Sequence, residues 1–233
     1  MGTQADLRFS DLIGQTEVIT RLEAYSEFYS SAGGTPGHIL LIGEEGMGQS
    51  RIAKTLANER GVPFWMAEAA ELVVSGDVTA ILTNLRANQV FLLSGIQGLR
   101  KIHWQNLLSA MRHRKLPIVI GTGPAARTHV MDVKPFTLVA TCPRKSDCPA
   151  ALVEEFSLVL AMQAYSAEEI ELLAHQVAKR ENLHLEQMAA QLMARHSERR
   201  PRSAEATVLR IARAVNKSLI SEDDVRRVLS LSG

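Results

Sequence analysis

The eight residues from Gly43 to Ser50 have the types and the spacing that hold a phosphate group. The pattern G-x-x-x-x-G-K-[ST] cradles nucleotide phosphates with backbone N–H groups at a helix start, while its lysine neutralises them and its hydroxyl binds Mg²⁺. Gly43, Gly48 and Ser50 fit this pattern, but Gln49 stands at the lysine position. The segment therefore predicts a nucleotide site that lacks its main positive charge.

Two carboxylates, Glu44 and Glu45, lie inside the same loop and would repel a phosphate. Losing one charged hydrogen-bonding partner costs about 1.5–3 kcal/mol, or roughly ten- to hundredfold in affinity. The backbone of Gly46 and Gly48 and the start of the helix still leave weak ADP or ATP binding open. The alternative, which we favour, is that the loop only connects a strand to a helix.

The elements beside the loop are those that a phosphate site needs. Residues 38–42 form an apolar run typical of a strand buried on both faces of a parallel sheet, and residues 51–60 have the spacing of a helix. A second apolar strand, residues 90–93, runs into Ser94 and Gly95. Neither residue binds a metal strongly or acts as a base, so the sequence predicts no catalytic residue and no metal site.

The remaining hydrophobic periodicity predicts an α/β chain that becomes all-helical towards its end. Ser166 and Glu169 form a capping-box pattern at the start of the helical part. We expect two domains, 1–164 with the sheet and 165–233 with helices only. Further helices are expected within 7–30 and near 78–85, 104–111, 166–180, 186–195, 203–216 and 222–230, a hairpin at 118–120 and 129–131, and strands at 136–140 and 158–160.

Composition excludes several classes of function. The 233 residues are 46% hydrophobic and 22% charged, and 26 basic residues balance 25 acidic ones, so no bulk charge indicates nucleic acid or membrane as a partner. No apolar run approaches the length of a membrane span, and we expect a cytoplasmic protein. Cys142 and Cys148 have no second cysteine pair beside them, which predicts reduced thiols and not a metal site.

Longer segments carry a more specific pattern than the loop alone. They are Phe9 to Gln15, the degenerate loop, Asp77 to Leu85, Ile118 to Arg127 and Pro135 to Leu138. Together they resemble the RuvB family, the AAA+ motors of Holliday-junction branch migration, from about residue 8 to 231. The resemblance implies a AAA+ P-loop sandwich with a parallel sheet between helices (αβα), followed by a helical lid domain.

The resemblance also identifies what has changed. It places the family's P-loop lysine at Gln49 and its acidic pair at Ser94 and Gly95. The sensor-1 region falls at 141–144, and the segment that carries the family's arginine finger falls at 152–156, which holds Glu154 and Glu155 but no arginine. These departures imply a degenerate ATPase that is not an enzyme.

Other positions of the family's nucleotide site are kept. The resemblance implies adenine contacts at Ile13 and Tyr165 and a sensor-2 role for Arg202. It also leads us to expect that the DNA-gripping winged-helix domain, which follows the lid in the family, is absent. The implied vestigial nucleotide-binding set is Gly43, Gly46, Gly48, Gln49, Ser50, Ile13, Tyr165 and Arg202.

A candidate partner surface is the hairpin around 121–127. In the family this hairpin docks on RuvA through apolar contacts, and Ile118, Ile120, Val130 and Met131 keep that apolar character. A hairpin with apolar tips usually needs a partner to cover it. The alternative is that these side chains pack inside their own domain, and the sequence favours neither.

The resemblance thus predicts a catalytically inactive RuvB-like pseudo-ATPase that acts as a protein-binding, scaffolding or regulatory subunit. Its expected partner is RuvA-like, RuvB-like or another AAA+ subunit. A second interpretation is a weak or partner-activated ATP/ADP-binding module of a DNA-processing complex. A third is a DNA-binding accessory that uses the basic stretches 112–115 and 195–202, although these lack interleaved aromatics and nucleic-acid binding stays unsupported.

Overall fold

The computed structural model describes residues 7–120, 127–214 and 218–230. It divides into two compact units, which are described separately. The described residues of the first unit belong to Met1–Asp11, Glu17–Glu44 and Gln49–Met162, and those of the second to Leu12–Thr16, Glu45–Gly48 and Gln163–Gly233.

The first unit is built on a parallel sheet in which the strand before the glycine loop lies second from one edge. The strand order is β2-β3-β6-β1-β7. Side chains at the middle of β1 are completely buried, as the apolar run predicts for a strand covered on both faces. The strands are β1 (His38–Ile42), β2 (Phe64–Glu68), β3 (Gln89–Ser94), β6 (Phe136–Cys142) and β7 (Phe156–Ala161).

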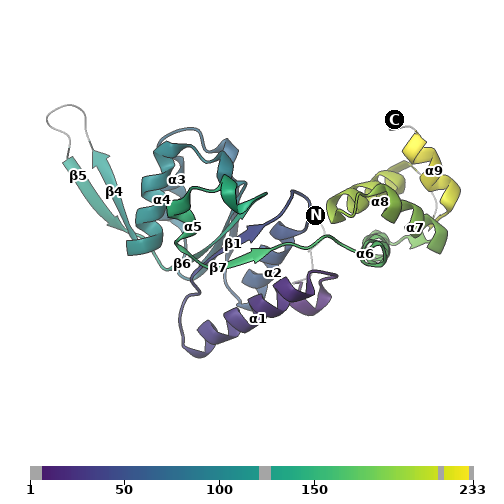
Figure 1. Cartoon of the computed structure of the whole chain (residues 1–233), viewed down its shortest axis with the longest axis horizontal. Coiled ribbons are helices and arrows are strands. Elements are labelled where there is room, and N and C mark those ends of the chain that lie inside the picture. The colour runs from purple at the N-terminus through teal and green to yellow at the C-terminus, as the bar shows by residue number, and fades with distance from the viewer. Residues whose placement is uncertain (1–6, 121–126, 215–217, 231–233) are drawn as a thin grey trace. The chain divides into compact units, whose positions relative to one another are not determined.

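Helices cover both faces of this sheet, which confirms the predicted αβα class (Figure 1). Right-handed crossovers place the helix after β1 on one face and the helices after β2, β3 and β6 on the other. The helices of this unit are α1 (Thr16–Ser31), α2 (Gln49–Glu59), α3 (Asp77–Asn84), α4 (Lys101–His113) and α5 (Ala150–Val153). Short 3-10 turns occur at Phe9–Asp11, Ala69–Glu71, Ile96–Gly98 and Lys145–Asp147.

A two-stranded hairpin extends away from the sheet of the first unit (Figure 1). Its antiparallel strands, β4 (Lys115–Ile120) and β5 (Arg127–Asp132), lie in sequence between α4 and β6. At its root, the Val133 N–H donates to the Arg114 carbonyl over 2.8 Å. The hairpin prediction is confirmed with longer strands, and residues 121–126, which it placed in the turn, lie outside the described residues.

The second unit is a small helical bundle. Its first long helix begins at the predicted capping box, because the Ser166 hydroxyl accepts from the Glu169 N–H and the Glu169 carboxylate accepts from the Ser166 N–H. Its elements are α6 (Ala167–Arg180), β8 (His184–Leu185), α7 (Gln187–His196), α8 (Pro201–Ala214), β9 (Leu219–Ile220) and α9 (Glu222–Ser230). Within the described ranges, no helix combines the length and the apolarity that a membrane crossing requires.

Candidate functional site

Gln49, at the position of the P-loop lysine, is the first residue of α2 and is almost fully buried. Its amide nitrogen Nε2 donates to the Gly43 carbonyl over 3.0 Å and to the Glu44 carbonyl over 2.9 Å. The side chain therefore folds back onto the loop of its own unit. Its two N–H donors are used by backbone oxygens, and it contributes no positive charge to the loop.

The start of the loop is tightly packed against the sheet. The Gly43 N–H donates to the Cys142 carbonyl at the end of β6 over 2.9 Å. A Cβ built on Gly43 would come within 2.7 Å of the Met162 Cβ, so this position excludes any larger residue for steric reasons. Ser50, the candidate Mg²⁺ ligand, is exposed on the first turn of α2.

The end of β3 carries no acid that could hold a metal or activate water. Its last residue is Ser94, and Gly95 follows in the left-handed region with φ 63°. The Gly95 N–H donates to the Thr141 hydroxyl over 2.9 Å, which joins the ends of β3 and β6. The hydroxyl of Thr141, in the predicted sensor-1 region, thus accepts from a backbone N–H. The described residues contain no cluster of three or more metal-ligating side chains.

The middle of the loop belongs to the second unit, where Arg202 of helix α8 and Tyr165, which precedes α6, contact it. Gly46 and Gly48 have φ values of 88° and 93°, which only glycine adopts at low cost. The Gly46 carbonyl accepts from the Arg202 N–H over 3.2 Å, and the Arg202 side chain forms an ion pair with Glu45. The charge of the predicted sensor-2 arginine is therefore already balanced by a loop glutamate.

Tyr165, a predicted adenine contact, is buried within the second unit. Its hydroxyl donates to the Met47 carbonyl over 3.3 Å. Its ring packs so closely on Gly14 that an added Cβ there would approach Tyr165 Cε1 to 2.6 Å. Ile13 is the other predicted adenine contact, and Gly14 follows it directly in the chain. The structure thus brings Tyr165 next to the residue after Ile13.

The register of the hairpin divides the predicted partner-binding residues between two faces. Leu116 pairs with Met131, Pro117 with Val130, and Ile118 with His129. Directly paired residues share a face and successive residues alternate, so Met131 and Ile118 face one side and Val130 faces the other. Val130 and Met131 are 53% and 38% exposed, and nothing is described of the Ile120 side chain.

The basic stretches are partly neutralised. Arg112 Nε lies 2.7 Å from Glu155 Oε1, and Arg200 Nε lies 4.0 Å from Glu198 Oε2. Glu155 is consequently turned towards α4, whereas Glu154, its neighbour at the predicted finger segment, is exposed. The arrangement offers fewer unpaired cations for a phosphate backbone than the sequence count suggests.

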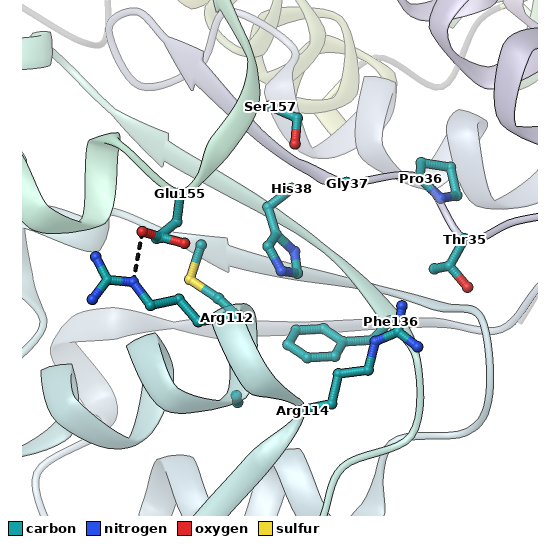
Figure 2. A pocket seen from close by; sticks show the side chains of 11 residues that line it. Thr35, Pro36, Gly37, His38, Arg112, Arg114, Phe136, Glu155 and Ser157 are labelled. Atoms are coloured by element: carbon teal, nitrogen blue, oxygen red, sulfur yellow. Dashed lines mark hydrogen bonds and ion pairs between the residues drawn. The ribbon is translucent and has the colours of Figure 1, made fainter.

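A cavity of about 260 Å³ lies at the amino ends of the strands of the first unit, at the end of the sheet opposite the start of the loop (Figure 2). The Arg112–Glu155 ion pair lies at one side of this cavity, and the His38 ring points into its centre. The lining residues are Thr35, Pro36, Gly37, His38, Ala110, Met111, Arg112, Arg114, Phe136, Glu155 and Ser157.

His38 is a neutral structural histidine. Its Nδ1 accepts from the Leu138 N–H over 3.0 Å, and its ring lies 5.1 Å from the ring of Phe136. Burial lowers the pKa of His38 to about 4. Sequence reasoning missed this histidine and its cavity, because the lining residues come from segments far apart in the chain and follow no motif.

Comparison with known proteins agrees with this fold and loop. Residues 6–162 match the family model described as the Holliday junction DNA helicase RuvB P-loop domain. The RuvB subunit of the Holliday junction branch migration complex from Koribacter versatilis is 35% identical over 201 residues, which is 86% of this chain and 56% of that protein. Its counterpart from Campylobacter hominis is 32% identical over 228 residues, or 97% of this chain and 67% of that protein.

A solved structure, the Holliday junction branch migration motor RuvB of Thermotoga maritima, superposes with a TM-score of 0.82 at 25% identity. It matches over 96% of this chain and 71% of its own chain. The fold and the glycine loop thus define a P-loop protein of the AAA+ class. Within that class, this chain belongs to the RuvB family of Holliday-junction branch-migration motors. It spans between 56% and 67% of the length of these two relatives.

Proposed function

We propose that this chain is a RuvB-family protein that has lost ATP hydrolysis and acts by binding another protein. The observation that carries the proposal is the bonding of Gln49, whose amide donors are held by the Gly43 and Glu44 carbonyls. Phosphoryl transfer in P-loop proteins needs a lysine on the phosphates, an acid-bound Mg²⁺ and a positioned water. The corresponding positions here hold Gln49, Ser94 and Gly95.

Calorimetric titration of the whole chain with ADP or ATP and Mg²⁺, together with a phosphate-release assay, tests this proposal. We expect no release above the buffer rate and only weak binding. Gln49→Lys should raise nucleotide affinity about ten- to hundredfold, because a charged hydrogen bond is worth about 1.5–3 kcal/mol. Protein-dependent hydrolysis by the unaltered chain would overturn the proposal.

The partner that we propose is RuvA-like, and the docking surface is the hairpin β4–β5. Every residue of β5 is exposed, including Val130 and Met131. Apolar side chains at such exposure on a hairpin that pairs only with itself favour a covering partner. RuvB-like or other AAA+ subunits are the alternative partners of the same proposal.

The two faces of the hairpin allow a sharp test with a RuvA-like domain as the titrant. Met131→Asp changes the face that carries Ile118, and Val130→Asp changes the other. An aspartate at a binding hot spot should weaken association by about 2–4 kcal/mol, which is at least roughly thirtyfold. Met188→Asp, at a 55% exposed residue of the second unit, is the matched control. Equal affinities for all three variants and the unaltered chain would exclude hairpin docking.

A second candidate function, weak nucleotide binding within a DNA-processing complex, is favoured by the conformation of the loop. Gly46 and Gly48 keep positive φ values, and Tyr165 remains buried against Met47. A calorimetric signal at tens of micromolar nucleotide, without hydrolysis, would support this candidate. Its loss on Gly48→Val would locate the site in the loop.

A further inference from the structure

The cavity at the amino ends of the strands is lined by two rings, and hydrogen bonds hold its lining in place. The rings of His38 and Phe136 lie 5.1 Å apart with an angle of 44° between their planes, and the Leu138 N–H donates to the His38 ring. The Pro36 carbonyl accepts from the Thr137 hydroxyl over 2.8 Å. Because these bonds fix the lining before any ligand enters, binding here costs little conformational entropy.

The charges of the lining include one cation without a counter-ion. Arg112 is paired with Glu155 over 2.7 Å, and the nearby Asp132 is taken by Lys115 over 2.7 Å. The side chain of Arg114 is exposed, and no carboxylate of the described residues pairs with it. Since Arg112 and Glu155 cancel, the lining carries one positive charge in excess, which favours an anionic ligand.

The backbone of Arg114 gives a second reason to assign its side chain a ligand. Arg114 follows the last residue of α4 in the left-handed region, with φ 54°, and its N–H donates to the Ala110 carbonyl over 3.0 Å. Glycine adopts this conformation at a lower cost than arginine, so the end of the helix does not require a side chain here. In Figure 2, the Arg114 guanidinium and the Arg112–Glu155 pair lie on opposite sides of the His38 ring.

We propose that this cavity binds a small organic anion with a single planar ring, which carries either a carboxylate or a phosphate monoester. The ring of the ligand packs against His38 and Phe136, and its acid group accepts hydrogen bonds from Arg114. A guanidinium presents a planar fork of N–H donors that matches both kinds of anion. The cavity volume of about 260 Å³ is the share of about nine molecules of liquid water, which suits one ring with one acid group.

This site is separate from the glycine loop. His38 is the first residue of β1, and Gly43 follows its last residue. A strand of these five residues spans about 16 Å, so a single-ring ligand cannot reach both ends. Binding in the cavity requires neither a charge in the loop nor a protein partner, and the proposal therefore stands if the proposed function fails.

Amide NMR spectra of the isotope-labelled whole chain, titrated with benzoate at constant pH and ionic strength, test the proposal. We expect saturable shifts within residues 35–38, 112–115 and 136–138, none within 43–50, and a Kd of about 0.1–1 mM. The Leu138 amide should report the ligand ring, because it donates to His38. The absence of saturable shifts up to about 10 mM ligand, or shifts centred on 43–50, would overturn the proposal.

A series of ligands tests the two halves of the expected chemistry. Benzamide lacks the charge and acetate lacks the ring, so each should bind at least about tenfold more weakly than benzoate. Phenyl phosphate compares the two acid groups, and the tighter of phenyl phosphate and benzoate identifies the acid that the site prefers. Benzamide binding as tightly as benzoate would overturn the role of the cation, and equal binding of acetate would overturn that of the rings.

Arg114→Gly separates ligand binding from a structural role. Glycine suits the left-handed backbone, so the variant should keep the amide spectrum of the fold, whereas its affinity for benzoate should fall at least about tenfold. Arg114→Lys keeps the charge without the planar fork and should bind with an intermediate affinity. The matched control is Arg199→Gly, because Arg199 has φ 57° and lies in the second unit. Unchanged affinity in Arg114→Gly, or an equal loss in Arg199→Gly, would overturn the proposal.

Discussion

The two ends of the five-stranded sheet satisfy their polar groups in different ways. At the carboxyl end, the Gln49 amide and the Thr141 hydroxyl bond to backbone groups of the same unit. At the amino end, Arg112 and Glu155 line an open cavity beside the root of a hairpin whose apolar side chains are exposed. The comparison teaches that, at the carboxyl end, backbone groups of the same unit satisfy the Gln49 amide and the Thr141 hydroxyl, whereas the amino end lies beside exposed apolar side chains of the hairpin.

The largest expected difference between the two ends of the sheet is a loss of stability at acidic pH that arises at the amino end. His38, at the amino end, has a pKa lowered to about 4, against 6.5 for an ordinary histidine. Between these values the unfolded chain binds a proton that the folded chain does not. Above about pH 6.5, His38 therefore does not reduce the free energy of unfolding. As the pH drops towards 4, that free energy falls by roughly 3 kcal/mol in total.

Urea unfolding at pH 7.5 and at pH 4.5 checks this prediction. The control is His38→Asn, whose side-chain oxygen can accept from the Leu138 N–H but does not titrate. The difference in unfolding free energy between the two pH values should be smaller in the variant. Equal differences in both proteins would show that His38 is not the acid-sensitive group.

A steric change at the carboxyl end should have the next largest effect. Gly43→Ala places a Cβ 2.7 Å from the Met162 Cβ and should cost about 2 kcal/mol of unfolding free energy. Gly76→Ala is the matched control, because its added Cβ would meet no atom within 4 Å and its φ is −86°. Thermal unfolding of both variants checks this prediction. Equal midpoints would contradict the steric argument for Gly43.

Removing the Gln49 amide, which donates to two carbonyls of the loop, should lower the free energy of unfolding less than Gly43→Ala does. Gln49→Leu keeps the size of the side chain but withdraws the donors from the Gly43 and Glu44 carbonyls, which should cost about 1 kcal/mol. Gln49→Lys retains a donor and should cost less. A Gln49→Leu chain as stable as the unaltered one would mean that water satisfies both carbonyls. The two amide hydrogen bonds would then contribute no net stability.

The smallest effect is expected from the ion pair at the amino end. Arg112→Gln should reduce stability by about 0.5 kcal/mol and the loss should shrink in high salt, since the pair is partly exposed. Lys115→Gln, which removes a more exposed pair with Asp132, should change stability by less. Chemical denaturation at low and high salt measures both. A salt-independent loss would indicate packing by the Arg112 stem instead.

Much of the fold could be predicted because its elements carry strong local patterns. The run 38–42 became β1, and the Ser166–Glu169 box opened α6 as expected. Strand β2 was missed, since it lies at the edge of the sheet, where Trp65 and Met66 are exposed and no two-sided apolar run forms. Helix α8 starts earlier than predicted, at Pro201, because proline is well accommodated in the first turn.

The site was harder to predict than the fold. Residue types showed which charges the loop lacks, but they could not show that Gln49 bonds to two loop carbonyls or that Arg202 pairs with Glu45. Alternation along β5 could have placed Val130 and Met131 on opposite faces, and this pattern went unused.

The strand order has a consequence for how the chain folds during synthesis. Strand β1 pairs on one side with β6 and on the other with β7, both of which are made long after it. Until Ala161 has left the ribosome, this buried strand keeps at least one open edge. Such non-local pairing is slow and exposes the chain to aggregation. Nascent chains that end before β6 should therefore depend on a chaperone, whereas chains that extend through β7 should not.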